Sequence, residues 1–132
     1  MRRLAGVLLL AALAGGCGGR AAAGTGTVVT ITIHHSRFQP AELWVRPGSS
    51  VRFVVRNTDP IDHELIIGDQ AVQQRHEHGT ERHHDAPGEV SVAAGQEATT
   101  TFTFPAVPGR LEYACHLPGH YAYGMHAPIL VG

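Results

Sequence analysis

The segment Cys115-His-Leu-Pro-Gly-His120-Tyr-Ala-Tyr-Gly-Met125 decides how the rest of the chain is interpreted. It carries a thiol, an imidazole and a thioether, with four residues between each consecutive pair. Pro118 and Gly119 favour a bend that turns the chain back on itself. The preceding residues, 110–115, alternate like a β-strand, so the thiol stands at a strand end. With a second imidazole, these donors would make the ligand set of a blue-copper centre.

The second imidazole is available upstream, where His63 opens the apolar stretch 63–67. Taken singly, each of the four residues has an ordinary interpretation: a small buried cysteine, a core histidine or a core methionine. Taken together, the four favour metal ligation. A structural zinc site made of the same residues is the alternative, although a thioether is a poor zinc ligand.

These motifs resemble those of the cupredoxins, the single-domain blue-copper proteins. The loop Cys115-x-x-Pro118-Gly119-His120 is similar to that of azurin and auracyanin, and Met125 completes a spacing that auracyanin-like members share. The resemblance implies a Greek-key β-sandwich that holds one type 1 copper per chain. It implies that His63, Cys115 and His120 are equatorial ligands and that Met125 is the axial ligand.

The sequence departs from this family at one position beside the metal ligands. Many cupredoxins carry Asn directly after the upstream ligand His, where the side chain links the two ligand loops. This chain has Glu64 there. The departure leaves open how the two loops are joined. Asn57 and Glu64 are the candidate residues for holding the ligands in place.

Short strands separated by Gly/Pro turns predict an all-β fold, a cupredoxin-like β-sandwich with a His-rich loop insertion. The polar insert spans residues 68–88 and is too long for a tight hairpin. It is either a solvated loop, with a short helical turn compatible with its sequence, or a second, weaker and exposed copper-capture site. The candidate ligands of that second site are His76, His78, His83 and His84. The expected strands cover residues 27–33, 43–45, 51–55, 63–67, 90–92, 99–104, 111–115 and 129–131.

The N-terminus has the pattern of an export signal. A basic start precedes the apolar run 4–13, which is too short to span a bilayer, and small residues lead to Cys17. We interpret 1–16 as a lipoprotein-like signal peptide, 17–26 as a flexible tether and 27–132 as the cupredoxin domain. Cys17 would carry a lipid anchor. Cleavage after 21–23, giving a secreted protein, is the alternative. Either processing route predicts an extracytoplasmic protein, periplasmic or at the cell surface.

Charge and composition exclude several function classes. The chain has no lysine, and removing Arg2 and Arg3 leaves 10 − 2 = 8 arginines against 11 acidic residues, a net charge of 8 − 11 = −3. A nucleic-acid surface would need a basic stripe, so none is expected. A multicopper oxidase would need several His-x-His pairs, and His76-Glu77-His78 is the only such pair in the sequence. No third group completes a nucleophilic dyad of Cys115 and His120. We therefore expect that the protein is not an enzyme.

Two functions therefore remain for a protein that we expect to be monomeric. The first is a single-electron carrier. The alternative is an extracytoplasmic copper-handling protein that functions in copper buffering, copper delivery or copper resistance. It would use the same site plus the His-rich loop. In either role, a redox partner or a copper-trafficking protein would dock on the apolar patch around His120, which contains residues 117–119 and 121–123. Histidines 116 and 126, which flank the ligands, are expected to face solvent.

Overall fold

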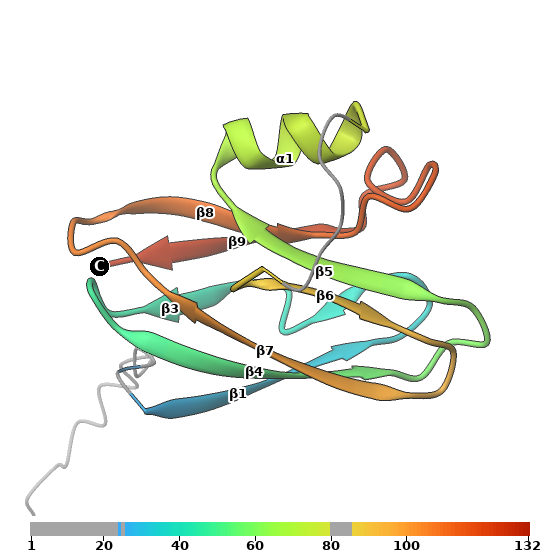
Figure 1. The fold of residues 1–132 in the computed structure, drawn as a ribbon, viewed down its shortest axis with the longest axis horizontal. Coiled ribbons are helices and arrows are strands. Elements are labelled where there is room, and N and C mark those ends of the chain that lie inside the picture. The colour runs from blue at the N-terminus through green and yellow to red at the C-terminus, as the bar shows by residue number, and fades with distance from the viewer. Residues whose placement is uncertain (1–23, 25, 80–85) are drawn as a thin grey trace, which may run out of the picture.

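The computed structural model describes residues 24, 26–79 and 86–132. Over these ranges the chain forms two β-sheets that face one another, with a single helix on the outside of one sheet (Figure 1). No helix in these ranges is long and apolar enough to cross a bilayer. The predicted all-β sandwich is confirmed by the two facing sheets.

One sheet has four strands in the order β2-β1-β4-β7, and the other has five in the order β3-β9-β8-β5-β6. The pairs β1·β4 and β3·β9 are parallel, and the remaining pairs are antiparallel. The strand bounds are β1 (Thr27–Ile33), β2 (Phe38–Gln39), β3 (Leu43–Val45), β4 (Ser50–Asn57), β5 (His63–Gly68), β6 (Glu89–Val92), β7 (Glu97–Thr103), β8 (Gly109–Ala114) and β9 (His126–Val131).

Alternation of apolar and polar residues places the core between the sheets. In β4, Val51, Phe53 and Val55 are fully buried, while Arg52 and Arg56 face solvent. The period of two in a strand gives each sheet one apolar face, and the two apolar faces pack together. Strand β5 is the exception, since all six of its residues are buried.

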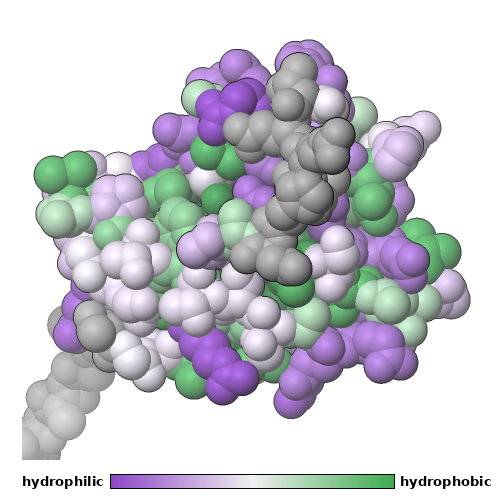
Figure 2. Space-filling view, viewed as in Figure 1, coloured by the Kyte–Doolittle hydropathy of each residue, from purple (hydrophilic) through white to green (hydrophobic). Residues whose placement is uncertain are grey.

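Helix α1 (Gln70–Glu77) explains the burial of β5 on both faces. The helix packs against β5 and β8 and covers the outer side of their sheet (Figure 1). Asp69 caps its N-terminus by accepting a hydrogen bond from the Val72 N–H at 2.9 Å. The exposed surface of α1 is polar, and polar side chains gather over it at the top of the face in Figure 2. Part of the predicted loop insertion is therefore a helix.

Strand ends bring the four candidate ligands to one end of the sandwich. His63 begins β5, Cys115 directly follows β8, and Met125 directly precedes β9. Because β5·β8 and β8·β9 are antiparallel, the start of β5, the end of β8 and the start of β9 lie at the same end of the sheet. His120 lies in the β8–β9 connection, which is red at the right of Figure 1.

The close approach of α1 to β5 depends on the absence of a side chain at Gly68. A Cβ placed there would lie 2.4 Å from the Val72 Cβ. We expect Gly68→Ala to reduce the free energy of unfolding by about 1–3 kcal/mol, because the helix must shift outward. Urea denaturation of the metal-free protein measures this change.

Gly109 offers the matched control, since it also lies in a strand, but a Cβ placed there would have no described atom within 4 Å. Gly109→Ala should leave stability unchanged or slightly higher. Equal effects of the two substitutions would contradict the proposed role of Gly68.

Candidate metal centre

Three of the predicted ligands converge within the described part of the chain. The Nδ1 atoms of His63 and His120 are 3.3 Å apart, and the Cys115 Sγ is 3.3 Å from the His120 Nδ1. Ligand atoms of the three residues all lie within 4.8 Å of one another. His63 and Cys115 are buried and His120 is half-buried. A thiol and two imidazole nitrogens thus face one small volume.

Met125 is held beside these residues by its main chain. Its carbonyl accepts a hydrogen bond from the Cys115 N–H at 3.1 Å, and its own N–H donates to the His120 carbonyl at 3.0 Å. The side chain is buried in the same core cluster as Cys115. Main-chain hydrogen bonds therefore hold Met125 close to both Cys115 and His120.

A series of tight turns shapes the loop between Cys115 and Met125. The His120 N–H donates to the Leu117 carbonyl at 2.9 Å, and the Tyr123 N–H donates to the Gly119 carbonyl at 3.0 Å. Gly119 has φ 84°, in the left-handed region that glycine adopts without strain. The Pro118-Gly119 bend predicted from the sequence lies here, and it directs His120 back toward the sulfur.

Burial controls the protonation of the thiol in the metal-free protein. Desolvation raises the pKa of Cys115 to about 11, although hydrogen bonds from the Glu64 and Leu117 N–H groups to the sulfur favour the thiolate. Burial, together with the neighbouring His63, lowers the pKa of His120. At neutral pH, then, the site presents a neutral imidazole at His120 and a thiol whose proton a metal must displace.

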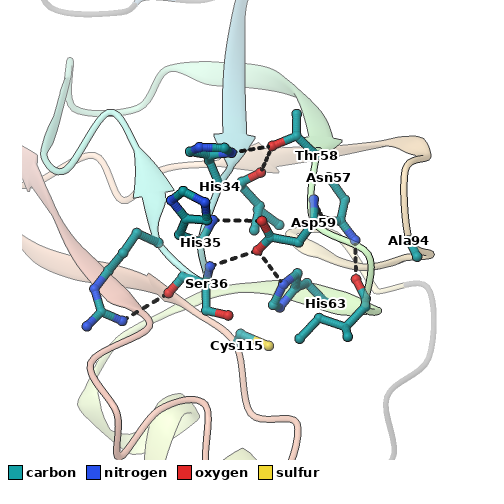
Figure 3. A network of polar contacts seen from close by, with 12 residues as sticks. His34, His35, Ser36, Asn57, Thr58, Asp59, His63, Ala94 and Cys115 are labelled. Atoms are coloured by element: carbon teal, nitrogen blue, oxygen red, sulfur yellow. Dashed lines mark hydrogen bonds and ion pairs between the residues drawn. The ribbon is translucent and has the colours of Figure 1, made fainter.

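The other ring nitrogen of His63 contacts a buried carboxylate. Its Nε2 lies 3.0 Å from the Asp59 Oδ2, and Asp59 also accepts hydrogen bonds from the His35 and Ser36 N–H groups, each at 2.7 Å (Figure 3). Burial alone would raise the pKa of Asp59, but the bonds from Ser36, His35 and His63 outweigh it and lower the pKa. Asp59 was not among the residues predicted from the sequence. Its position four residues before the candidate ligand His63 is the one sequence feature that could have indicated this contact.

Asn57, a candidate support residue, fixes the loop that leads to His63. Its Nδ2 donates to the carbonyls of Ile61 (2.7 Å), Val92 (3.1 Å) and Ala93 (3.1 Å). Its Oδ1 accepts from the Asp59 N–H at 3.0 Å. One buried amide therefore joins β4, the loop before β5 and the end of β6.

Glu64 stands where many cupredoxins have Asn, and it links the two ligand loops in place of that residue. Its Oε1 accepts a hydrogen bond from the His116 N–H at 2.7 Å. This bond joins the residue after His63 to the residue after Cys115. The carboxylate at position 64 thus connects the two loops in this chain.

The expectation that His116 faces solvent is wrong. The residue is 9% exposed because α1 covers its ring: the Nε2 lies 2.7 Å from the Gln73 Oε1 and the Nδ1 lies 2.9 Å from the Glu77 Oε2. The ring also stacks on Tyr121, with centroids 4.8 Å apart. Burial lowers the pKa of His116, while the Glu77 carboxylate opposes this shift. His126 is exposed, as expected.

Of the predicted second copper-capture site, the structure describes His76 and His78. His76 is only 2% exposed and faces inward from α1, with its Nδ1 2.9 Å from the Val72 carbonyl and its Nε2 3.4 Å from the Glu89 Oε1. The expectation of an exposed His76 is therefore wrong. His78 is exposed at the C-cap of α1. His83 and His84 lie outside the described residues.

The surface around His120 has the apolar character that we expected. Tyr123 is 80% exposed, and Pro118, Gly119 and Ala122 are also exposed. Leu117 and Tyr121 are half-buried beside them. The half-buried imidazole of His120 thus lies in a small apolar patch at the end of the molecule.

Comparisons with known proteins agree with this geometry. The profile of the family "Copper binding proteins, plastocyanin/azurin family" matches residues 26–132. The chain is 36% identical to the copper-resistant cuproprotein CopI of Rubrivivax gelatinosus, over 86% of this chain and 70% of that protein. It is 29% identical to CopI of Pseudomonas aeruginosa, over 78% and 75% of the two chains. The fold is similar to that of reduced auracyanin from Roseiflexus castenholzii, with TM-score 0.69 and 22% identity over 83% and 99% of the chains.

The bond between Glu64 and His116 should contribute measurably to stability. We expect Glu64→Ala to lower the free energy of unfolding of the metal-free protein by about 1–3 kcal/mol, because the buried His116 N–H loses its acceptor. Glu64→Gln keeps an acceptor oxygen and should retain most of the stability. Denaturant titrations of both variants measure the difference, and an equal loss in both would show that the acceptor oxygen is unimportant.

The raised pKa of Cys115 should appear in its alkylation rate. In a metal-free Cys17→Ser protein, only about one thousandth of Cys115 is thiolate at pH 8, since its pKa is about 11. The rate of reaction with iodoacetamide should rise roughly tenfold per pH unit from pH 8 to pH 10. The urea-unfolded protein is the control and should level off near pH 9. A plateau below pH 9 in the folded protein would contradict the assignment.

Proposed function

This chain belongs to the plastocyanin/azurin family of copper-binding proteins, and from that premise we propose that it holds one type 1 copper ion and carries single electrons outside the cytoplasm. The proposed ligands are His63, Cys115, His120 and Met125. The observation that carries the proposal is the approach of a thiol and two imidazole nitrogens to within 4.8 Å of one another.

The donor set fits copper better than the alternatives. Thiolate, imidazole and thioether donors suit a metal that alternates between a soft and a borderline oxidation state. Zinc sites seldom use a thioether, and calcium and magnesium prefer oxygen donors. Bound copper would supply a one-electron couple whose potential depends on the axial ligand and on the hydrogen bonds to the sulfur.

Hydrogen bonds around the site support electron transfer because they hold the ligand residues in fixed positions. Main-chain bonds hold Met125 to Cys115 and to His120, while Glu64 joins the loops that carry His63 and Cys115. A site that is already rigid needs little rearrangement when its charge changes. The half-buried His120 ring in its apolar patch offers an exit route, and we propose that a redox partner docks there.

Copper handling is the second candidate function. The relatives from Rubrivivax gelatinosus and Pseudomonas aeruginosa are both named copper-resistant cuproprotein, and the first aligns over 86% of this chain. On this alternative the same four ligands would buffer copper or deliver it to a trafficking protein at the His120 patch. We propose a binding protein rather than an enzyme in either case.

We further propose that the protein is exported and held by a lipid on Cys17. Strand β1 begins at Thr27, which pairs with Val51, and ends at Ile33, which pairs with Asn57 beside the metal centre. A seven-residue strand is about 23 Å long. Strand β1 begins at the end of the sandwich opposite the β8–β9 connection (Figure 1). A tether that enters there would present the His120 patch away from the membrane, where a partner could reach it.

Metal analysis and EPR of the purified, copper-reconstituted protein test the site. We expect one copper per chain and an intense blue colour that Cys115→Ser abolishes. Because Cys115 is buried, Cys115→Ala is compared as a second variant, and both are checked for folding by circular dichroism. A blue spectrum that survives in either variant would exclude Cys115 as a ligand.

The same preparation distinguishes the two functions. An electron carrier should keep its single copper in the presence of a chelator and exchange electrons rapidly with a small redox reagent. A copper-handling protein should bind more than one ion or transfer copper readily to the chelator.

A further inference from the structure

We propose that Asp59 is a positioning residue for His63: its carboxylate holds the ring proton on Nε2 and so keeps the Nδ1 lone pair free for the metal. This inference rests on the proposed copper site. Nothing in the sequence pattern or in the comparisons assigns a role to Asp59.

The first step is the hydrogen-bonding capacity of the two groups. A neutral imidazole has one N–H and one lone pair, and an ionised carboxylate can only accept. The His63 Nε2 lies 3.0 Å from the Asp59 Oδ2, so the proton belongs on Nε2. The His63 side chain is fully buried, which leaves no water to compete for this proton.

The second step is the direction of the other ring nitrogen. The Nδ1 of His63 lies 3.3 Å from the Nδ1 of His120, which in turn is 3.3 Å from the Cys115 Sγ. The lone pair that Asp59 leaves on Nδ1 therefore faces the other two donors. Swapping the proton to Nδ1 would place an N–H where the metal must bind.

The third step is that the carboxylate itself is held by a strained turn. The His35 N–H donates to Oδ1 and the Ser36 N–H donates to Oδ2, each at 2.7 Å (Figure 3). His35 and Ser36 have φ 50° and 52°, values that non-glycine residues seldom adopt. Two successive N–H groups in such a conformation form a concavity that binds anions. The turn between β1 and β2 is thus shaped around the Asp59 carboxylate.

A purely structural role for Asp59, as an anchor for this turn, makes different predictions. An anchor would affect stability but would not influence which nitrogen of His63 carries the proton. The shared Oδ2, which accepts from both Ser36 and His63, couples the turn to the ring. A hydrogen bond of this kind fixes ring orientation and makes the ligand more basic, and its loss typically weakens metal binding by about 10–100-fold.

The tautomer can be measured without copper. Long-range ¹H–¹⁵N correlation spectra of the metal-free protein distinguish Nε2–H from Nδ1–H in His63. We expect Nε2–H in the wild type and a roughly tenfold increase in the Nδ1–H to Nε2–H ratio in Asp59→Asn, since an amide can donate to Nε2. A wild-type His63 that carries its proton on Nδ1 would overturn the proposal, and this measurement needs no variant to fold.

Asp62→Asn is the matched control. Asp62 caps the same loop by accepting from the Ala94 N–H at 2.9 Å, and its substitution removes the same charge one residue from His63. The tautomer ratio should stay at the wild-type value in this variant. An equal change in Asp62→Asn and Asp59→Asn would assign the effect to charge in the loop and overturn the specific role of Asp59.

Copper affinity supplies the second readout. Chelator competition should show about 10–100-fold weaker Cu(II) binding in Asp59→Asn, with a smaller loss for Cu(I), because the cupric ion gains more from a basic imidazole. A tenfold loss confined to Cu(II) corresponds to a rise of about 59 mV in the reduction potential. Unchanged potential and unchanged tautomer in a folded Asp59→Asn protein would leave Asp59 as a turn anchor only.

The tautomer measurement and the copper-binding measurement together distinguish a failure of this inference from a failure of the proposed function. A wild-type protein that shows the Nε2–H tautomer but binds no copper would refute the copper site and support the Asp59–His63 pairing. A blue protein whose His63 tautomer is independent of Asp59 would support the copper site and refute the positioning role.

Discussion

The structure depends on holding a thiol and two imidazoles close together in a largely apolar interior. Buried polar groups are costly unless they are hydrogen-bonded, and lone pairs aimed at one point gain nothing from each other. Each donor must therefore be fixed by contacts with its own neighbours. Some of the bonds that do this are local, such as the contact of Asp59 with His63, and others join distant segments, such as the bond from His116 to Glu64.

Support reaches the site from two sides. On the side of the β2-β1-β4-β7 sheet, Asn57 holds the loop before β5 and Asp59 connects the β1–β2 turn to the His63 ring. On the other side, α1 covers the residue after Cys115, where Gln73 and Glu77 contact the His116 ring. Glu64 joins the two ligand loops between them. The insert is thus part of the framework around the site as well as a segment rich in histidine.

This arrangement changes how the histidine-rich insert is interpreted. The sequence left two interpretations open, a solvated loop and an exposed metal-capture site, yet His76 is directed into the protein, beside the His116 ring at a centroid distance of 5.8 Å. His76 and His116, two of the ten histidines in the chain, therefore serve packing and hydrogen bonding. The apolar patch around His120 offers a surface for exchange with partners, and its small size suits brief docking in either proposed function.

The sequence by itself determined the all-β class, most of the strands and the four candidate ligands. Strand alternation and the Cys115–Met125 spacing are local patterns, and local patterns can be recognised without coordinates. Strand β2 was missed because two residues are too short for a pattern. Helix α1 was anticipated only as a short helical turn within the insert, because its sequence lacks an apolar stripe. Only the tertiary structure decided that Asp59 contacts His63, that Glu64 joins the loops and that His116 is buried. Those contacts join strands, turns and a helix that are up to 52 residues apart, and their partners are set by the packing of the two sheets.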